Sequence, residues 1–256
     1  MIWNEFIYFA TVSLIFWLAG LLFLYFSKKK VLPDLFIITG LLVFATFIFV
    51  LWTVVGHPPL RTMGETRLWY SFFLVLVGYL TYLKCRFRWL VGYSIIVAGV
   101  FILINILRPE MHSTDLMPAL QSPWFIPHVT VYILAYALMG AATIASIIGI
   151  FKNDIEDRLI YMIDNMIYVG FAFLLSGMLM GAIWAKNAWG DYWTWDLKEI
   201  WAFITAATFL IYIHLRRTGY NPKRILWIIP VAFIMLIITW LGVSYLPSAS
   251  QSIHSY

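Results

Sequence analysis

The sequence predicts an all-α polytopic membrane protein, a bundle of about eight transmembrane helices with both termini extracytoplasmic. Hydrophobic residues make up 63% of the 256 residues and charged residues only 11%, whereas charged residues supply about 25% of a soluble globular domain. Long apolar runs recur along the whole chain, and basic residues gather in alternate connections between them. These observations exclude a soluble protein.

Most of the apolar runs reach the roughly 20 residues that a helix needs to cross about 30 Å of hydrocarbon. The third and seventh runs are short, so we expect each to borrow a turn from its loop. A seven-helix protein, with the seventh run as a re-entrant segment, is the alternative. The segment Asp154–Asn165 alternates charged and apolar residues and predicts a short helix on the cytoplasmic surface. The runs are Phe6–Phe26, Leu35–Val55, Leu68–Leu83, Trp89–Leu107, Val129–Phe151, Met166–Ala185, Ile200–Leu215 and Ile225–Leu246.

Basic residues predict which side of the membrane each connection occupies. Most of the 17 Lys and Arg residues follow the first, third, fifth and seventh runs, and an excess of such residues marks the cytoplasmic side. The net charge of +5 therefore has a topological explanation and does not indicate nucleic-acid binding. The single cysteine, Cys85, excludes a disulfide framework and a thiolate metal cluster. We expect a single membrane domain over residues 1–256, with an outer loop over residues 108–128.

Residues 186–199 form an extracytoplasmic Trp-rich segment that continues into the seventh run. A connector that only joins helices would be small, polar and turn-forming. An interfacial aromatic belt would account for about one tryptophan in such a loop. Indole rings stack on an apolar plane while their N–H groups face the interface, so this segment suits a planar, amphipathic ligand such as haem. The residues concerned are Trp189, Trp193, Trp195 and Trp201, with the charges of Asp191, Asp196, Lys198 and Glu199.

Two histidines flank the Trp-rich segment from other helices on the same predicted membrane face. His128 lies where the outer loop enters the fifth run, and His254 lies outside the eighth run. Imidazole is an axial ligand of haem iron, and two such ligands leave no position open for oxygen. Each of the two taken alone could equally be an ordinary surface histidine. His57 and His112, also on this face, receive no secure role.

His214 differs because it lies inside the seventh run. A rise of about 1.5 Å per residue from Ile200 puts it roughly 21 Å below the outer boundary, past the midplane. An ionisable side chain at that depth is costly and indicates a function. The alternative is a neutral imidazole that bonds to a neighbouring helix or snorkels with Arg216 and Arg217.

The run from Trp189 to Glu199 resembles the Trp-rich WWD signature of the haem-handling family in cytochrome c maturation. Its Lys-Glu ending is similar to the CcsA (ResC) branch rather than the CcmC branch. Leu197 departs from the family, which usually has proline there. Further similarities cover most of the chain: Gly56-His57-Pro58 with Leu60 and Glu65, His128-Val129-Thr130, Tyr212-Ile213-His214-Leu215-Arg216, and Ile253-His254-Ser255-Tyr256.

The resemblance implies a subunit of cytochrome c synthase, a haem lyase, that moves haem b outward and presents it to apocytochromes carrying Cys-x-x-Cys-His. The membrane would be a bacterial-type cytoplasmic membrane or an organellar energy-transducing one. His128 and His254 would be axial ligands of the outer haem. His214 would bind haem within the membrane, with the second ligand from a separate CcsB (ResB) subunit. The expected metal ligands are thus His128, His254 and His214, and the other expected haem-binding residues are Trp189, Trp193, Trp195, Asp196, Lys198 and Trp201.

The side chains of the Trp-rich segment allow narrower expectations. Lys198 is the first candidate partner for a haem propionate. Asp196 and Glu199 either orient Lys198 or an indole N–H, or anchor the start of the seventh helix. No catalytic residue is assigned, because the reacting thiols belong to the apocytochrome.

Three other functions compete with the synthase. The main alternative is a haem transporter or chaperone without ligation activity. A b-type electron carrier would usually place paired histidines within the bilayer, where only His214 is predicted. A solute transporter would usually show internal repeats and broken paired spans, and neither stands out here.

Overall fold

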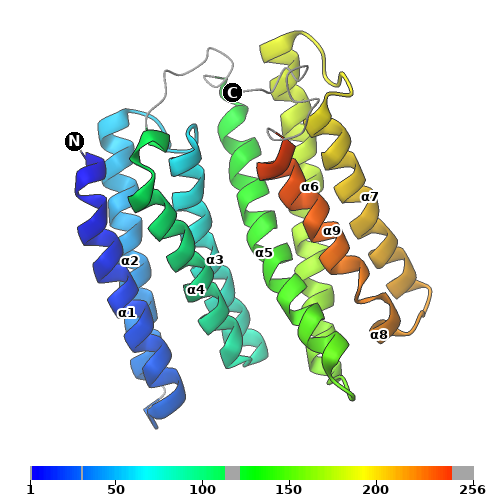
Figure 1. Cartoon of the computed structure of the whole chain (residues 1–256), viewed down its shortest axis with the longest axis horizontal. Coiled ribbons are helices and arrows are strands. Elements are labelled where there is room, and N and C mark those ends of the chain that lie inside the picture. The colour runs from blue at the N-terminus through cyan, green and yellow to red at the C-terminus, as the bar shows by residue number, and fades with distance from the viewer. Residues whose placement is uncertain (1, 30, 113–121, 244–256) are drawn as a thin grey trace. The chain divides into compact units, whose positions relative to one another are not determined.

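A computed structural model describes residues 2–29, 31–112 and 122–243 of the chain, and this part is helical with no strand (Figure 1). Eight helices are long and apolar enough to span a membrane, as the sequence predicted, and the protein is a multi-pass membrane protein. The elements are η1 (Ile2–Asn4), α1 (Phe6–Phe26), α2 (Val31–Val55), α3 (Met63–Cys85), α4 (Arg88–Leu107), η2 (Pro109–Met111), α5 (Phe125–Phe151), α6 (Asp157–Trp189), α7 (Leu197–Arg217), α8 (Pro222–Ile225), α9 (Ile228–Ile237) and the π-helical η4 (Ile238–Gly242).

The two short runs become full-length helices by taking residues from their loops. α3 has 23 residues and α7 has 21, so the expected extension is confirmed and the re-entrant alternative is wrong. Both helices begin with a capping box. In α3 the N-cap is Thr62 and its partner is Glu65, and in α7 the pair is Asp196 and Glu199. Each box satisfies amides that would otherwise lack partners at the first turn, so the helix can begin earlier than the apolar run.

The expected surface helix over Asp154–Asn165 is wrong, because α6 begins at Asp157 and continues for 33 residues. The charge that suggested a surface segment, Asp164, is buried within α6. Its carboxylate accepts from Nη2 of Arg216 at 2.6 Å and from the Tyr212 hydroxyl at 2.7 Å, both on α7. Neutralisation by α7 allows this aspartate inside a membrane-spanning helix.

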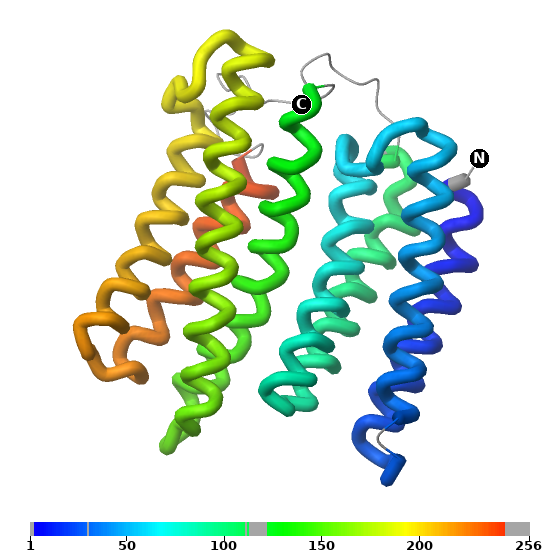
Figure 2. The backbone as a smooth tube through the Cα atoms, turned by 180° about the vertical axis from the view of Figure 1, so that it is seen from behind, coloured from blue at the N-terminus to red at the C-terminus, as the bar shows by residue number. Residues whose placement is uncertain are grey.

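The chain divides into two compact units, Met1–Met117 and Pro118–Tyr256. In the first unit α1 packs on α2 and α4, while α3 packs on α4 and α2 (Figure 2). In the second unit α5 packs on α6 and α9, while α7 packs on α9 and α6. A single membrane domain over residues 1–256 therefore stays a prediction.

Small residues allow the close helix contacts within each unit. A Cβ atom on Gly40 of α2 would stand 2.5 Å from Cδ1 of Trp17 on α1, and one on Gly78 of α3 would stand 2.0 Å from Oγ of Ser94 on α4. Helices in lipid associate through such close packing rather than through hydrophobic transfer from water. Trp17, with no exposed surface, and Phe44 then fill the core of the first unit.

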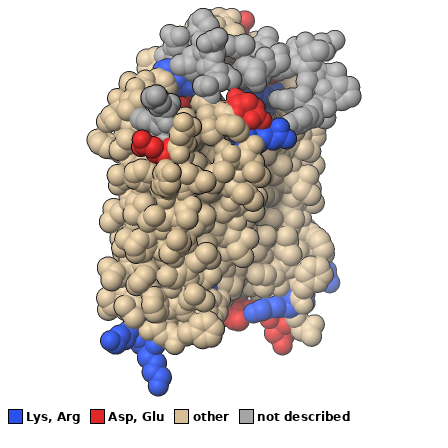
Figure 3. Space-filling model, turned by 60° about the vertical axis from the view of Figure 1, so that its left-hand side comes forward, with Lys and Arg blue, Asp and Glu red and all other residues tan. Residues whose placement is uncertain are grey.

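The surface also fits a lipid environment. Large apolar side chains are exposed along the helices, among them Leu22 and Leu42 in the first unit and Leu179 in the second. On the face drawn in Figure 3, the charged side chains of the described residues lie near the two ends of the helices, and a wide uncharged band separates them. Such a band is what the hydrocarbon region of a bilayer requires.

We predict that Asp164→Ala lowers the free energy of unfolding by about 3 kcal/mol, because the guanidinium of Arg216 loses its carboxylate in a largely buried site. The measurement is an SDS titration of helicity in mixed micelles. The exposed pair of Lys152 and Glu156 in the same unit is the control, and Glu156→Ala should change the value by no more than about 0.5 kcal/mol. Equal effects of the two variants would contradict the assignment.

Candidate haem-handling site

His128 is held at the start of α5 by a bond to the neighbouring helix. Its Nδ1 lies 2.8 Å from the carbonyl oxygen of Gly177 on α6. A carbonyl only accepts, so Nδ1 carries the proton and donates it, and in the neutral ring Nε2 keeps the lone pair. This is the way in which metal-binding histidines are usually oriented, with one nitrogen bonded to the protein and the other directed to the metal.

Two glycines of α6 make room for this arrangement. A Cβ atom on Gly181 would stand 2.6 Å from Cε1 of His128, and one on Gly177 would stand 2.7 Å from Cδ1 of Tyr132. Both distances are too short for real Cβ contacts, so the rings of α5 lie where side chains of α6 would otherwise be. The two glycines are four residues apart and therefore share one helix face.

An aromatic cluster continues from His128 toward the Trp-rich segment. The indole of Trp184 lies parallel to the imidazole of His128, with 5.8 Å between ring centroids. Phe125 packs against Trp184 at 5.4 Å, and Trp189 meets Trp184 edge-on at 6.2 Å. The predicted site residues His128 and Trp189 are thus linked through Trp184, a residue of the sixth apolar run that was not among the predicted site residues.

The rest of the Trp-rich segment forms a second aromatic group. α6 ends at Trp189, and its C-cap Gly190 has a φ of 96°, which suits glycine; the chain then turns back toward α7. Trp193 meets Trp195 edge-on at 5.8 Å, and Trp195 meets Phe203 of α7 at 6.0 Å. Trp201 lies on the first turns of α7 with a half-buried side chain. Trp193 and Trp195 therefore come together, whereas Trp189 joins the cluster of His128.

Two features of this group are typical of ligand-binding sites. Trp195 is 62% exposed and has φ of 60°, a left-handed conformation that is unfavourable for a bulky residue. Backbone strain of this kind persists where the surroundings hold it and is concentrated at functional sites. The indole Nε1 of Trp193 is buried and has no hydrogen-bond partner among the described residues. A ligand acceptor would satisfy this N–H.

The carboxylates of Glu199 and Asp196 accept hydrogen bonds from backbone amides of the Trp-rich segment and the start of α7. One carboxylate oxygen of Glu199 accepts from the amides of Thr194 at 2.8 Å and Asp196 at 3.1 Å. The Asp196 carboxylate accepts from the amide of Lys198 at 3.3 Å. Of the two roles considered for these acids, the structure shows the anchoring of α7. The amino group of Lys186 bonds to the carbonyl of Gly190, which fixes the end of α6.

His214 lies three residues before the end of α7 and its side chain is exposed. Tyr212 and Arg216, two residues away on either side, turn inward to Asp164. His214 therefore lies on the opposite face of α7, together with the exposed side chains of Phe203 and Leu210. The alternative of an imidazole bonded to a neighbouring helix has no support in the described residues, since no hydrogen bond of the His214 ring is found there.

The remaining predicted residues belong to the first unit or are not described. The Nδ1 of His57 lies 3.1 Å from the carbonyl of Pro58, and Glu65 caps α3, both within the first unit. His112 stacks on Trp3 at 3.9 Å, and burial lowers the pKa of its ring. His254 lies outside the described residues, so its expected pairing with His128 stays a prediction.

Comparison with known proteins identifies the class. Residues 6–250 match the family model described as cytochrome C assembly protein. A relative from Coffea arabica, named cytochrome c biogenesis protein CcsA, is 31% identical over 93% of this chain and 87% of its own length. Relatives of the same name from Chlamydomonas reinhardtii and Solanum lycopersicum are each 32% identical over 90% of this chain, covering 69% and 85% of their own lengths.

The eight spans and the match over nearly the whole chain define a membrane protein of the cytochrome c assembly class. The chain belongs to the cytochrome C assembly protein family. The relatives reported above are of the CcsA type, as the Lys-Glu ending of the Trp-rich signature predicted.

We predict that Gly181→Ala lowers the free energy of unfolding by about 1–3 kcal/mol, because the new methyl group displaces the His128 ring. In His128→Ala/Gly181→Ala the loss should be smaller than the sum of the single losses, which SDS titration measures as a coupling energy. Gly99→Ala is the control, since its Cβ atom would meet Leu14 at an ordinary 3.7 Å. Additive losses would contradict the packing described.

Proposed function

We propose that this chain is a subunit of a cytochrome c synthase that binds haem b, exports it and presents it for covalent attachment to apocytochromes. The observation that carries the proposal is the orientation of His128, whose Nδ1 donates to the Gly177 carbonyl, which assigns the lone pair of the neutral ring to Nε2, the nitrogen that would coordinate iron. Membership of the cytochrome C assembly family and similarity to CcsA proteins support a role in cytochrome c biogenesis.

Haem is the substrate of this reaction, and the described residues suit its chemistry. The iron would take the imidazole of His128, and the exposed ring of Trp195 would face the apolar macrocycle. The indole N–H of Trp193 would donate to a polar group of the same ligand. We assign His254 as the second axial ligand on the family resemblance, because two imidazoles would limit the access of oxygen to the iron.

The charged residues take separate roles in this proposal. Lys198, in the first turn of α7, is the propionate partner that we propose. Asp196 contributes by capping α7, which fixes the backbone that carries Lys198 and Trp201. The acids therefore act on haem through the position of the helix rather than by contact.

Attachment itself needs no nucleophile from this chain. Each thiol of the Cys-x-x-Cys-His motif adds across one haem vinyl group, so that the sulfur bonds to carbon and the thiol proton ends on the vinyl. The chain contributes by holding the vinyl groups near the thiols, and such positioning accounts for a large part of many enzymatic accelerations.

The excess of basic residues in alternate connections supports an extracytoplasmic position for the Trp-rich segment. In the proposed arrangement haem leaves the cytoplasmic side near His214 and is attached on the opposite side. The membrane would be a bacterial-type cytoplasmic membrane or an organellar energy-transducing one.

The exposed position of His214 supports a partner subunit of the CcsB (ResB) type. An ionisable ring on the lipid-facing surface of a membrane-spanning helix is costly unless another chain covers it. Phe203, Leu210 and His214 form a stripe of exposed side chains at helical spacing along α7, which suits the packing of another helix. The partner would supply the second ligand of a haem within the membrane.

We expect that His214→Ala lowers the haem content of the co-purified two-chain complex, because one of the two proposed ligands is lost. The pyridine haemochrome of the complex measures this content. His57→Ala is the matched control, since its ring bonds to its own neighbour Pro58. Unchanged haem in the His214 variant would rule out this ligand.

The decisive test is co-expression with a CcsB-type partner and an apocytochrome that carries Cys-x-x-Cys-His. We expect covalent haem, detected by peroxidase activity of the denatured apocytochrome, and we expect His128→Ala to abolish it. Trp193→Ala should reduce it, whereas Trp227→Ala, an exposed tryptophan outside the segment, should not. Bound haem without any covalent product from the wild type would favour the alternative of a haem transporter or chaperone.

A further inference from the structure

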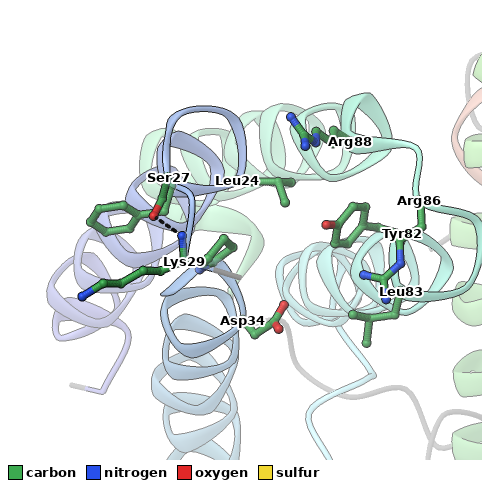
Figure 4. A pocket seen from close by; sticks show the side chains of 10 residues that line it. Leu24, Ser27, Lys29, Asp34, Tyr82, Leu83, Arg86 and Arg88 are labelled. Atoms are coloured by element: carbon green, nitrogen blue, oxygen red, sulfur yellow. Dashed lines mark hydrogen bonds between the residues drawn. The ribbon is translucent and has the colours of Figure 1, made fainter. Parts of the chain in front are cut away.

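The first unit contains a cavity of about 490 Å³ that is separate from every residue assigned to haem (Figure 4). It lies where α1 and α3 end and α2 and α4 begin. Ser27 caps the end of α1, Asp34 is in the first turn of α2, and Arg86 and Arg88 bound the short α3–α4 connection. The volume is within the range of pockets that bind small molecules.

Two guanidinium groups border this cavity without a carboxylate partner. Among the described residues, neither Arg86 nor Arg88 forms an ion pair within 4.0 Å. Their contacts are with aromatic rings, Arg86 over Tyr82 at 5.7 Å and Arg88 over Tyr25 at 6.0 Å. Arginine with no internal counter-ion, held in place by aromatic rings, is suited to bind an anionic group from outside.

The backbone of Arg86 gives a second, independent indication. Its φ of 56° is left-handed, a conformation in which glycine commonly ends a helix, and arginine is strained there. The backbone amide of Arg86 donates to the carbonyl oxygen of Tyr82 at 2.7 Å, so the end of α3 is well formed. A glycine would make the same turn more easily, so the turn alone does not account for an arginine at this position.

The other polar groups limit the kind of anion. Asp34 accepts a hydrogen bond from the Tyr79 hydroxyl at 2.9 Å, and in Figure 4 its carboxylate faces the side of the cavity that carries Tyr82 and Arg86. The amino group of Lys29 points away from the cavity in the same view. Two guanidiniums and one carboxylate favour a ligand with a single negative charge and a hydroxyl group beside it.

The apolar wall and the position in the chain identify the class of ligand. Phe23, Leu24 and Leu83 line the cavity beside the charged groups. Because the cavity lies at the ends of membrane-spanning helices, it is at the depth of lipid headgroups. Basic pockets between such helices bind anionic headgroups. None of the described residues that line it is a His, Cys or Met, the usual side chains that hold haem iron through nitrogen or sulfur.

We propose that the first unit binds an anionic phospholipid in this cavity, with the phosphodiester between Arg86 and Arg88. The acyl stem lies along Phe23 and Leu83, and a headgroup hydroxyl donates to Asp34. The proposal does not depend on the haem function, because no residue of the proposed haem site takes part.

The test uses the full chain in phosphatidylcholine nanodiscs with increasing fractions of phosphatidylglycerol, and native mass spectrometry counts the bound lipid. We expect one phosphatidylglycerol per chain. Each guanidinium removed should weaken binding about fivefold, so Arg86→Gln/Arg88→Gln should weaken it about 25-fold. Lys28→Gln/Arg224→Gln is the control, because it removes two exposed positive charges that do not line the cavity and should leave binding unchanged.

A second variant separates binding from folding. Arg86→Gly should weaken binding about fivefold while the thermal midpoint stays the same or rises, because glycine relieves the left-handed backbone. Equal retention of phosphatidylglycerol by wild type and both Arg86 variants would overturn the proposal. So would an Arg86-dependent rise of the thermal midpoint with inorganic phosphate but not with phosphatidylglycerol, which would indicate a free anion, or an Arg86-dependent haem spectrum in the isolated chain.

Discussion

α5 and α6 approach each other closely because α6 presents Gly177 and Gly181 to the rings of Tyr132 and His128. The same approach brings Nδ1 of His128 within 2.8 Å of the Gly177 carbonyl. The close helix packing and the orientation of the His128 ring therefore have one cause, which is that Gly177 and Gly181 leave one face of α6 without side chains. Trp184, one turn further along α6, extends the contact toward Trp189.

A related constraint governs the charges inside the spans. Asp164 is paired with Arg216 and bonded to Tyr212, and Glu65 and Glu199 accept from amides at the starts of α3 and α7. Burial of a charge in a membrane is costly without such partners. These acids thus hold helices in place through the hydrogen bonds that they accept. Among the residues that the structure describes, no inward partner of the His214 ring is found, and for this reason we propose that this group contacts a second chain.

Much of the fold could be predicted from the sequence because membrane crossing depends on local length and composition. The capping box of α7 could also be found in the sequence, because Asp196 and Glu199 are three residues apart, although the sequence left the role of these two acids open. The start of α6 could not be predicted, because Asp164 is neutralised by a residue 52 positions later. The position of the His128 ring was not predicted for a similar reason, since it depends on glycines about 50 residues away in α6. The only signal for it in the sequence was the four-residue spacing of Gly177 and Gly181. His254 is beyond the described residues.

In the proposed function, the imidazole of His128, oriented by α6, is the outer ligand of haem iron. The most direct test is the absorption spectrum of His128→Gly in complex with a CcsB-type partner, with and without free imidazole. We expect the low-spin bands of the outer haem to be lost in the variant and to return when imidazole fills the space of the missing ring. Unchanged low-spin bands without imidazole would show that a residue other than His128 is the ligand.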